Sequence, residues 1–292
     1  DNVSGGVRLD GAQSSSGFGV SAATVGDMNN DGIDDMLIGA PGEANKLGAA
    51  YLVFGKSDWG YNPSYVKQFA SGNGEHGVRI LGEQSGDLFG SDVDYAGDVN
   101  GDNMSDVIIG APGANSGLGV AYVLFGKDVS LLGAQFPAEI DIEGLLSFQG
   151  FRIEGVLADG GLGSAVSNAG DVNGDGLDDF IVGAPGANSG LGVAYVLFGY
   201  DTHKVGDQYY ATVDLADLQI EQGFMIQGQT PDGSFGAAVT GLGDINADGF
   251  DDFSIGAPGS SGSTGSVSSG AAYVVLGRDD WSDTVENGEW LV

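Results

Sequence analysis

The chain has 292 residues, no cysteine, 9 basic and 41 acidic side chains, and a formal net charge of −32 at pH 7. This charge argues against a surface for nucleic acid or an anionic membrane, and the lack of cysteine excludes a disulfide framework and, with only two histidines, a zinc centre. A hydrophobic content of 41% argues against reading the acidity as disorder.

A short alternating phrase opens the chain and returns three times. Because apolar and polar residues alternate in it, the phrase predicts a β-strand at residues 6–11, 77–82, 150–155 and 223–228. A Phe-Gly pair and a strand of small residues follow each copy. The pair is Phe18-Gly19, Phe89-Gly90 and Phe235-Gly236, with Leu162-Gly163 in the third copy.

An acidic loop comes next in every copy, and the leading aspartates of the four loops are 71, 73 and 73 residues apart. Oxygen-bearing side chains occupy loop positions 1, 3, 5 and 9, and the backbone carbonyl at position 7 can add another oxygen. Calcium takes six to eight such oxygens in a flexible shell, so the spacing predicts four calcium ions per chain, one in each loop. The expected ligands are Asp27, Asn29, Asp31, Ile33, Asp35, Asp98, Asn100, Asp102, Met104, Asp106, Asp171, Asn173, Asp175, Leu177, Asp179, Asp244, Asn246, Asp248, Phe250 and Asp252.

Two other kinds of loop share part of this pattern. An EF-hand loop has the same beginning, but it requires an acid at position 12, where the third copy has Val182. Asn-Gly and Asp-Gly turns form without any ion, but they do not require oxygen-bearing residues at fixed spacing in four copies. The second loop departs from the others, with Asn103 at position 6 and Ser105 at position 8, so we expect it to bind calcium most weakly.

Each loop leads into an apolar strand that ends in Gly-Ala-Pro, then a polar hairpin, then a fourth strand. The last strands are expected at residues 49–54, 120–125, 193–198 and 271–276, and each carries a tyrosine: Tyr51, Tyr122, Tyr195 and Tyr273. The recurrence at one strand position favours packing over an aromatic platform for a ligand. The connections 57–76, 128–149 and 201–222 differ most from one another, and such loops on a rigid scaffold usually carry binding specificity.

Together these motifs resemble the FG-GAP repeats of the integrin α-subunit β-propeller and of related bacterial extracellular proteins. The resemblance implies an all-β fold, a β-propeller of four FG-GAP blades with about 73 residues and four antiparallel strands each, and calcium loops between the first two strands of each blade. We expect a single domain over residues 1–292, with repeats at approximately 6–76, 77–149, 150–222 and 223–292. The strand at Val7 would close a four-bladed ring beside the strand of Tyr273, with an open arc completed by further repeats as the alternative.

The function implied is that of an extracellular, secreted or cell-surface module for adhesion, for binding a protein or glycan, or for structure. Its partners would be an extracellular protein or glycan, or other copies of itself, and it would not be an enzyme, bind nucleic acid or span a membrane. Four bound calcium ions would change the net charge from −32 to −24. Two alternatives remain open: an accessory or catalytic domain of a larger secreted enzyme acting on polysaccharides, and a self-assembling extracellular structural protein.

Overall fold

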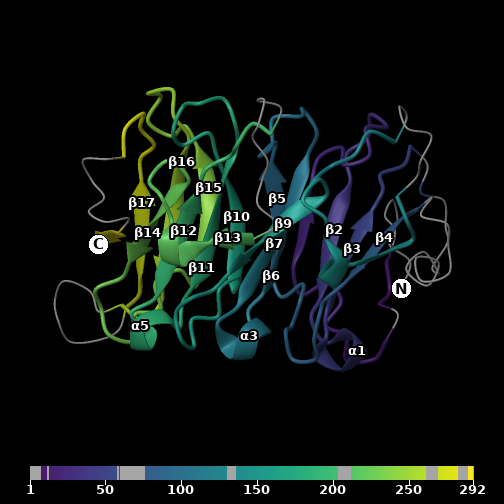
Figure 1. The fold of residues 1–292 in the computed structure, drawn as a ribbon, viewed down its shortest axis with the longest axis horizontal. Helices are drawn as coiled ribbons and strands as arrows, with labels where there is room; N and C mark the ends of the chain where they lie inside the picture. The colour runs from purple at the N-terminus through teal and green to yellow at the C-terminus, as the bar shows by residue number, and fades with distance from the viewer. Residues whose placement is uncertain are drawn as a thin grey trace.

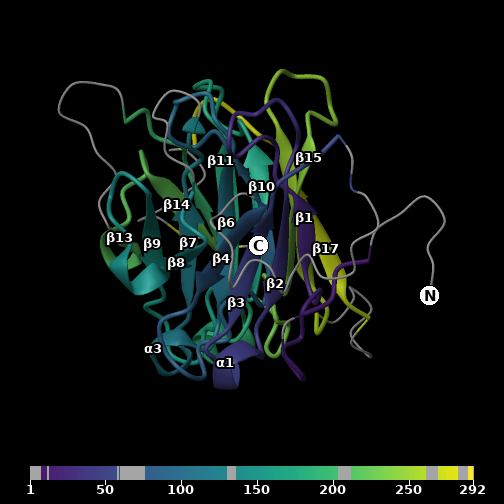
Figure 2. The same ribbon diagram turned by 90° about the vertical axis from the view of Figure 1, so that its right-hand side faces the viewer.

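The computed structural model describes residues 8–11, 13–57, 59, 76–129, 136–202, 212–260, 269–281 and 289–291. Within these ranges the chain forms four β-sheets that stand side by side in a row (Figure 1). Seen along that row, the sheets lie one behind another (Figure 2). The fold is therefore all-β, as predicted.

Within each sheet the strands stand in their order along the chain, although neighbouring strands near the outer edge are not always consecutive. The first sheet contains β1 (Ala22–Thr24), β2 (Met36–Ala40), β3 (Ala49–Val53), β4 (Gly77–Leu81) and β8 (Glu139–Asp141). The second contains β5 (Val93–Gly97), β6 (Asp106–Ala111), β7 (Val120–Leu124), β9 (Gly150–Glu154) and β13 (Thr212–Asp214). The third contains β10 (Ala165–Gly170), β11 (Asp179–Ala184), β12 (Val193–Leu197), β14 (Gly223–Gln227) and β18 (Glu289–Leu291). The described part of the fourth contains β15 (Ala238–Gly243), β16 (Asp252–Ala257) and β17 (Ala271–Val275).

The predicted count of four antiparallel strands per blade needs correction. In the first three sheets a fifth, parallel strand of three residues lies outside the four antiparallel ones. Strand β8 comes from the connection between β7 and β9 of the second sheet, yet it pairs with β4 of the first, and the Arg79 guanidinium lies 2.9 Å from the Glu139 carboxylate. A connection of one blade therefore covers the edge of the preceding blade, which would otherwise expose unpaired backbone groups.

Sheets and sequence repeats are offset by one strand. The phrase that opens the second repeat forms β4, the fourth strand of the first sheet, and β9 and β14 stand in the same relation to the second and third sheets. The first copy of the phrase is different: residues 8–11 form no strand, and Leu9 packs on the first sheet near Tyr51. Val7, on which the predicted ring closure rests, lies outside the described residues.

Closure of the ring is not shown by the structure. Among the described residues no strand of the fourth sheet pairs with a strand of the first. The two sheets stand at opposite ends of the row in Figure 1.

The core consists of hydrophobic layers between neighbouring sheets. One layer lies between the first and second sheets and another between the second and third, and each contains the tyrosine of the later sheet. Tyr51, Tyr122 and Tyr195 are buried, and Phe89 meets Tyr122 edge to face with ring centroids 5.4 Å apart. The expectation that these tyrosines pack in the core is confirmed, and the ligand-platform interpretation is wrong for these three.

Short helical turns form the tips of the predicted polar hairpins in the first three sheets, where each joins two antiparallel strands. They are α1 (Glu43–Lys46), α3 (Ala114–Gly117) and α5 (Ala187–Gly190), and the two central residues of each have positive φ. The 3-10 turns η1 (Ile142–Gly144) and η2 (Leu215–Asp217) follow β8 and β13, and the side chains of Asp141 and Asp214 cap them.

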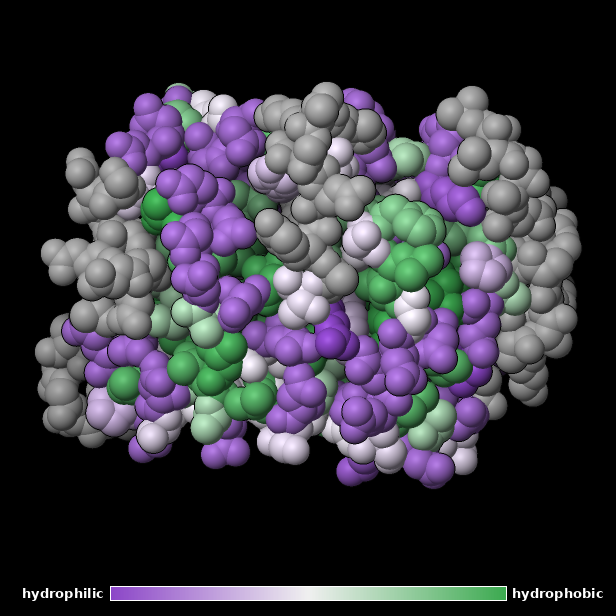
Figure 3. Space-filling view, viewed as in Figure 1, coloured by the Kyte–Doolittle hydropathy of each residue, from purple (hydrophilic) through white to green (hydrophobic). Residues whose placement is uncertain are grey.

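Hydrophilic residues cover much of the face seen in Figure 3, with hydrophobic patches between them. No helix among the described residues is long and apolar enough to cross a membrane.

Candidate metal centre

Each predicted calcium loop connects the first two strands of a sheet, so the four loops occupy equivalent places in the fold. In the first loop, the Asp27 carboxylate accepts hydrogen bonds from the backbone N–H groups of Asp31, at 3.0 Å, and Gly32, at 2.7 Å. The amide oxygen of Asn29 accepts a second bond from the Asp31 N–H at 2.9 Å. The Asp31 carboxylate accepts from the Ile33 N–H at 3.0 Å. These bonds fold the loop tightly around the side chains at positions 1, 3 and 5.

The same network recurs in the other three loops. The position-1 carboxylates of Asp98, Asp171 and Asp244 each accept from the N–H groups at positions 5 and 6, at 2.7–3.1 Å. The structure thus brings together the predicted side chains at positions 1, 3 and 5 in all four loops. Position 7 enters the network through its N–H, which donates to the position-5 carboxylate.

The aspartate at position 9 lies apart from the exposed rim of the loop. Asp35, Asp106, Asp179 and Asp252 are buried. The Asp179 carboxylate accepts from the Val172 N–H at 2.9 Å and from the Gly199 N–H at 2.9 Å, so it ties the loop to the second residue after the third strand. Equivalent pairs of bonds hold the other three carboxylates.

Burial changes the protonation of these groups. It raises the pKa of Asp35 to about 7 and that of Asp179 to about 8, and it raises the pKa of Asp106 well above the usual range, while backbone hydrogen bonds oppose the shift. At position 1 of the fourth loop, which is exposed, the backbone N–H of Gly249 lowers the pKa of Asp244. Without a cation, Asp35, Asp106 and Asp179 are therefore held in their protonated form at higher pH than an ordinary aspartate.

A pH dependence of stability follows from the raised values. A carboxyl whose pKa is 3.8 when unfolded and about 7 or 8 when folded stabilises the fold fully below about pH 4, and this contribution is lost as the pH rises through the folded value. We expect the cation-free protein to melt at a lower temperature at about pH 8.5 than at about pH 5. Scanning calorimetry of cation-free protein measures this, and Asp179→Asn should reduce the slope. A melting temperature that rises over this interval would contradict the assignment.

The oxygen atoms that each loop presents determine which kind of cation it could hold. Within the described residues, no group of three or more His, Cys, Asp or Glu side chains is arranged to hold a metal. Each loop instead combines two exposed or half-buried aspartates with one asparagine, and all three present oxygen atoms. A carboxylate oxygen that accepts one N–H keeps a further lone pair. The donors therefore fit a hard cation such as calcium, which takes carboxylate, amide and carbonyl oxygens.

Position 8, for which no role was predicted, links neighbouring loops. The Asp178 carboxylate of the third sheet accepts from the N–H of Asp98 in the second loop at 2.8 Å, and the Asp251 carboxylate accepts from the N–H of Asp171 at 3.0 Å. Ser105 lies in the equivalent place against Gly26. The sequence did contain a signal for this role, because position 8 carries an oxygen-bearing residue in all four copies. The loops are thus joined from blade to blade.

A buried charged group outside the loops was also missed. The Glu43 carboxylate accepts from the Tyr51 hydroxyl at 2.7 and 2.8 Å and forms an ion pair with Arg79. In the second sheet, Arg152 pairs with Glu83 at 3.2 Å near Tyr122. Burial and the adjacent glutamate raise the pKa of both tyrosines. These groups are partnered inside the blades, so we assign them a structural role.

Comparison with known proteins identifies the repeat. The family profile called FG-GAP repeat matches residues 18–53, 89–124, 162–197 and 235–275, about half of the chain. The chain belongs to the FG-GAP repeat family. The third match includes the FG-GAP copy in which Leu162 replaces phenylalanine, so that departure does not exclude it from the family.

Integrin α subunits are similar to this FG-GAP chain. Integrin alpha-PS5 of Drosophila melanogaster is 33% identical over 189 residues, which cover 61% of this chain and 16% of that protein. Integrin alpha-V of Gallus gallus is 29% identical over 250 residues, 83% of this chain and 20% of that protein. Integrin alpha pat-2 of Caenorhabditis elegans is 30% identical over 250 residues, 82% of this chain and 18% of that protein. The chain spans about a fifth or less of the length of these relatives.

The conformation of the second FG-GAP loop bears on the prediction that this loop binds calcium most weakly. Asn103 has φ 63°, a left-handed conformation that glycine adopts more easily. We expect Asn103→Gly to relieve this cost and to tighten calcium binding at the Asp102 loop, because the left-handed conformation costs an ordinary L-residue roughly 1–2 kcal/mol and glycine adopts it freely. Isothermal titration calorimetry of both proteins measures the effect. Weaker binding in the variant, or a wild-type second loop that fills before the others, would refute the ranking.

Proposed function

We propose that this chain is an extracellular, calcium-binding β-propeller domain that acts as an adhesion module and binds a protein or glycan ligand. The single observation that carries the proposal is the recurrence of one oxygen-lined loop network in all four FG-GAP repeats. One calcium ion would occupy each loop, held by the side chains at positions 1, 3 and 5, the carbonyl at position 7 and the carboxylate at position 9. Calcium at extracellular, millimolar concentrations suits loops of this kind.

The likeness to integrin α subunits supports the adhesion role and a location outside the cell or on its surface. Residues 1–292 would form one domain, with the four sheets as its blades. The loops between blades supply variable surface on a rigid scaffold, where binding specificity usually resides. The role proposed is binding rather than catalysis, and the net charge of −32 disfavours nucleic acid as a partner.

A binding experiment tests the proposal. The immobilised chain is presented with panels of extracellular matrix proteins and polysaccharides, in calcium and in chelator. We expect saturable binding of at least one ligand class that is lost in chelator. Turnover of a polysaccharide by the chain would favour the alternative that it is a catalytic domain of a secreted enzyme acting on polysaccharides. The absence of saturable binding across both panels would overturn the adhesion role.

A further inference from the structure

The outer face of the fourth sheet exposes hydrophobic residues whose counterparts in the other sheets are buried. Ile245 is 57% exposed and Val274 is 55% exposed. Their counterparts in the third sheet, Val172 and Val196, are completely buried. The difference has a simple cause, because each of the first three sheets is covered on this face by the sheet that follows it. The open face thus has the composition of an interface without its partner.

The three interfaces inside the chain show what such a partner must offer. At the second interface, a β-carbon added to Gly110 would lie 1.9 Å from the carbonyl oxygen of Gly163 in the next sheet. Gly39 and Gly183 stand in the same relation to Gly90 and Gly236, at 2.1 and 2.0 Å. The Phe-Gly or Leu-Gly turn of one sheet therefore rests directly on the second strand of the sheet before it.

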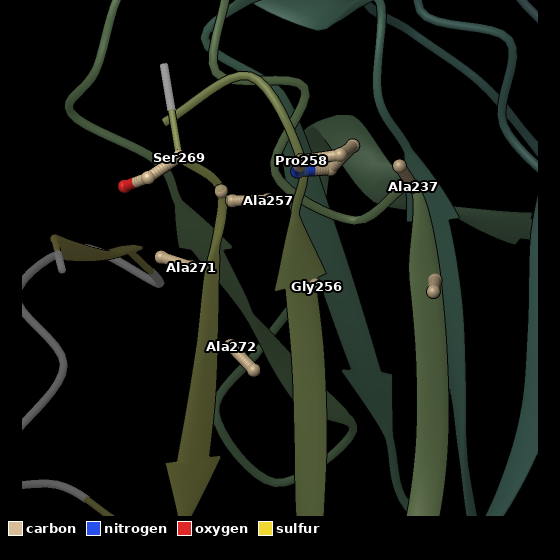
Figure 4. Close-up of a pocket in the computed structure, with 9 residues that line it drawn as sticks. Ala237, Gly256, Ala257, Pro258, Ser269, Ala271 and Ala272 are labelled. Carbon is tan, nitrogen blue, oxygen red and sulfur yellow. The ribbon is translucent and has the colours of Figure 1, made fainter. Parts of the chain in front are cut away.

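In the fourth sheet the corresponding residue is Gly256, and no described residue of another sheet packs against it. A β-carbon added to Gly256 would meet only Ala238, at 3.4 Å, among the described residues. A shallow depression of about 510 Å³ lies there, lined by residues that include Ala237, Pro258 and Ala272 (Figure 4). Figure 4 shows Gly256 on β16 between Ala237 at the start of β15 and Ala271 and Ala272 on β17. The depression lies where the other sheets receive the glycine of the next turn.

Each internal interface also contains hydrogen bonds between the two sheets. At the second and third interfaces the position-8 carboxylate of the later sheet accepts from the position-1 N–H of the earlier loop, as Asp178 does from Asp98 and Asp251 does from Asp171. In addition, the N–H of Arg278 donates to the carbonyl of Val172 at 2.9 Å, and Tyr200 and Lys127 donate in the same way to Val99 and Met28. The fourth loop presents the corresponding positions, Asp244 and Ile245, on an exposed surface.

The first sheet carries the complementary surface. Gly90, Gly163 and Gly236 each press against a carbonyl oxygen of the preceding sheet, whereas no described atom lies within 4 Å of a β-carbon built on Gly19. Asp34, the counterpart of Asp178 and Asp251, is exposed. Each half of the glycine packing contact that recurs three times inside the chain is therefore present once more, at opposite ends of the row, with no counterpart among the described residues.

We infer that the open face of the fourth sheet binds the Phe18-Gly19 turn and Asp34 of the first sheet of a second copy of this chain, head to tail. Gly19 would rest on Gly256, and Asp34 would accept from the N–H of Asp244. A second copy can dock without any change within the row, whereas closure within one chain would require the end sheets to leave their positions at opposite ends (Figure 1). Such a contact is heterologous, so it builds rings or filaments. The inference stands on the internal interfaces and not on the proposed adhesion role.

Sedimentation velocity in constant excess calcium tests the inference over about a hundredfold range of protein concentration. We expect the average mass to rise with concentration. Gly256→Val fills the receiving position and should weaken association by more than about tenfold. Gly144→Val is the matched control, since Gly144 is exposed, lacks a positive φ and has no neighbour within 4 Å of an added β-carbon. Equal melting temperatures of the two variants would show that both are folded.

A mixing experiment distinguishes docking of copies from other contacts. Asp34→Arg blocks the first sheet and Gly256→Val blocks the fourth, so each variant alone should stay monomeric while an equimolar mixture forms a dimer through the two intact faces. Wild-type protein that is monomeric at every concentration would overturn the inference, whether the ring closes within one chain or the face stays open. Association that neither substitution weakens would overturn it as well.

Discussion

Removal of calcium is expected to lower the melting temperature of this chain substantially. Each loop gathers two aspartates at positions 1 and 5, the buried position-9 carboxyl adds its charge only when it ionises, and no basic residue lies within any of the four loops. Carboxylates about 4 Å apart repel by roughly 4 kcal/mol per pair at an effective dielectric constant near 20. Bound ions remove that repulsion, and each independent site contributes about 2.7 kcal/mol when free calcium is 100 times the dissociation constant.

Scanning calorimetry in calcium, in chelator and after calcium is restored measures this effect. Magnesium at the same concentration is the control, because it demands a rigid octahedral shell and should restore less stability. Melting temperatures that agree in calcium and in chelator would be incompatible with occupied loops.

Replacing a buried position-9 aspartate should be the most damaging single substitution in a loop. Asp179→Ala removes the acceptor of two buried N–H groups, those of Val172 and Gly199. Each buried donor left without a partner costs about 1–3 kcal/mol, and the loop also loses a proposed ligand. We expect a large loss of the free energy of unfolding that persists in chelator, because the two hydrogen bonds do not depend on the ion.

Asp175→Ala in the same loop is the matched control. Asp175 is exposed, and its carboxylate accepts within the loop, from the Leu177 N–H. Its substitution should weaken calcium binding but change the unfolding free energy little in chelator. Chemical denaturation of the wild-type chain and both variants, with and without calcium, gives the free energies of unfolding that are needed. Equal losses in chelator would show that Asp179 does not anchor the fold.

The sequence predicted the parts of this fold that repeat. Four strands in each copy were predicted from alternation and from the Gly-Ala-Pro endings, and β4, β9 and β14 begin within the predicted phrases, whereas residues 8–11 of the first phrase form no strand. The loop side chains at positions 1, 3 and 5 were identifiable because their spacing recurs, and the structure brings them together. The calcium ions themselves and the ligand assignments remain predictions.

Other features of the fold and of the loops could not be predicted from the sequence. Strands β8 and β13 have three residues each and lie in connections without alternation, so only the edge of a neighbouring sheet defines them as strands. The sequence did not reveal the distinct role of position 9, because aspartate can serve either as a buried hydrogen-bond acceptor or as an exposed metal ligand. Only tertiary structure reveals that Asp179 reaches Gly199, which is 20 residues away. Glu43 was missed for the same reason, since its partner Arg79 lies 36 residues further along the chain.

Counting the calcium ions bound to the intact chain tests the central claim most directly. Native mass spectrometry of the wild-type chain in calcium should show four ions per chain, and substitution of a position-1 aspartate, such as Asp171→Ala, should reduce the number to three. A chain that binds no calcium, or a count that does not change when a position-1 aspartate is removed, would contradict the assignment of the four loops as calcium sites.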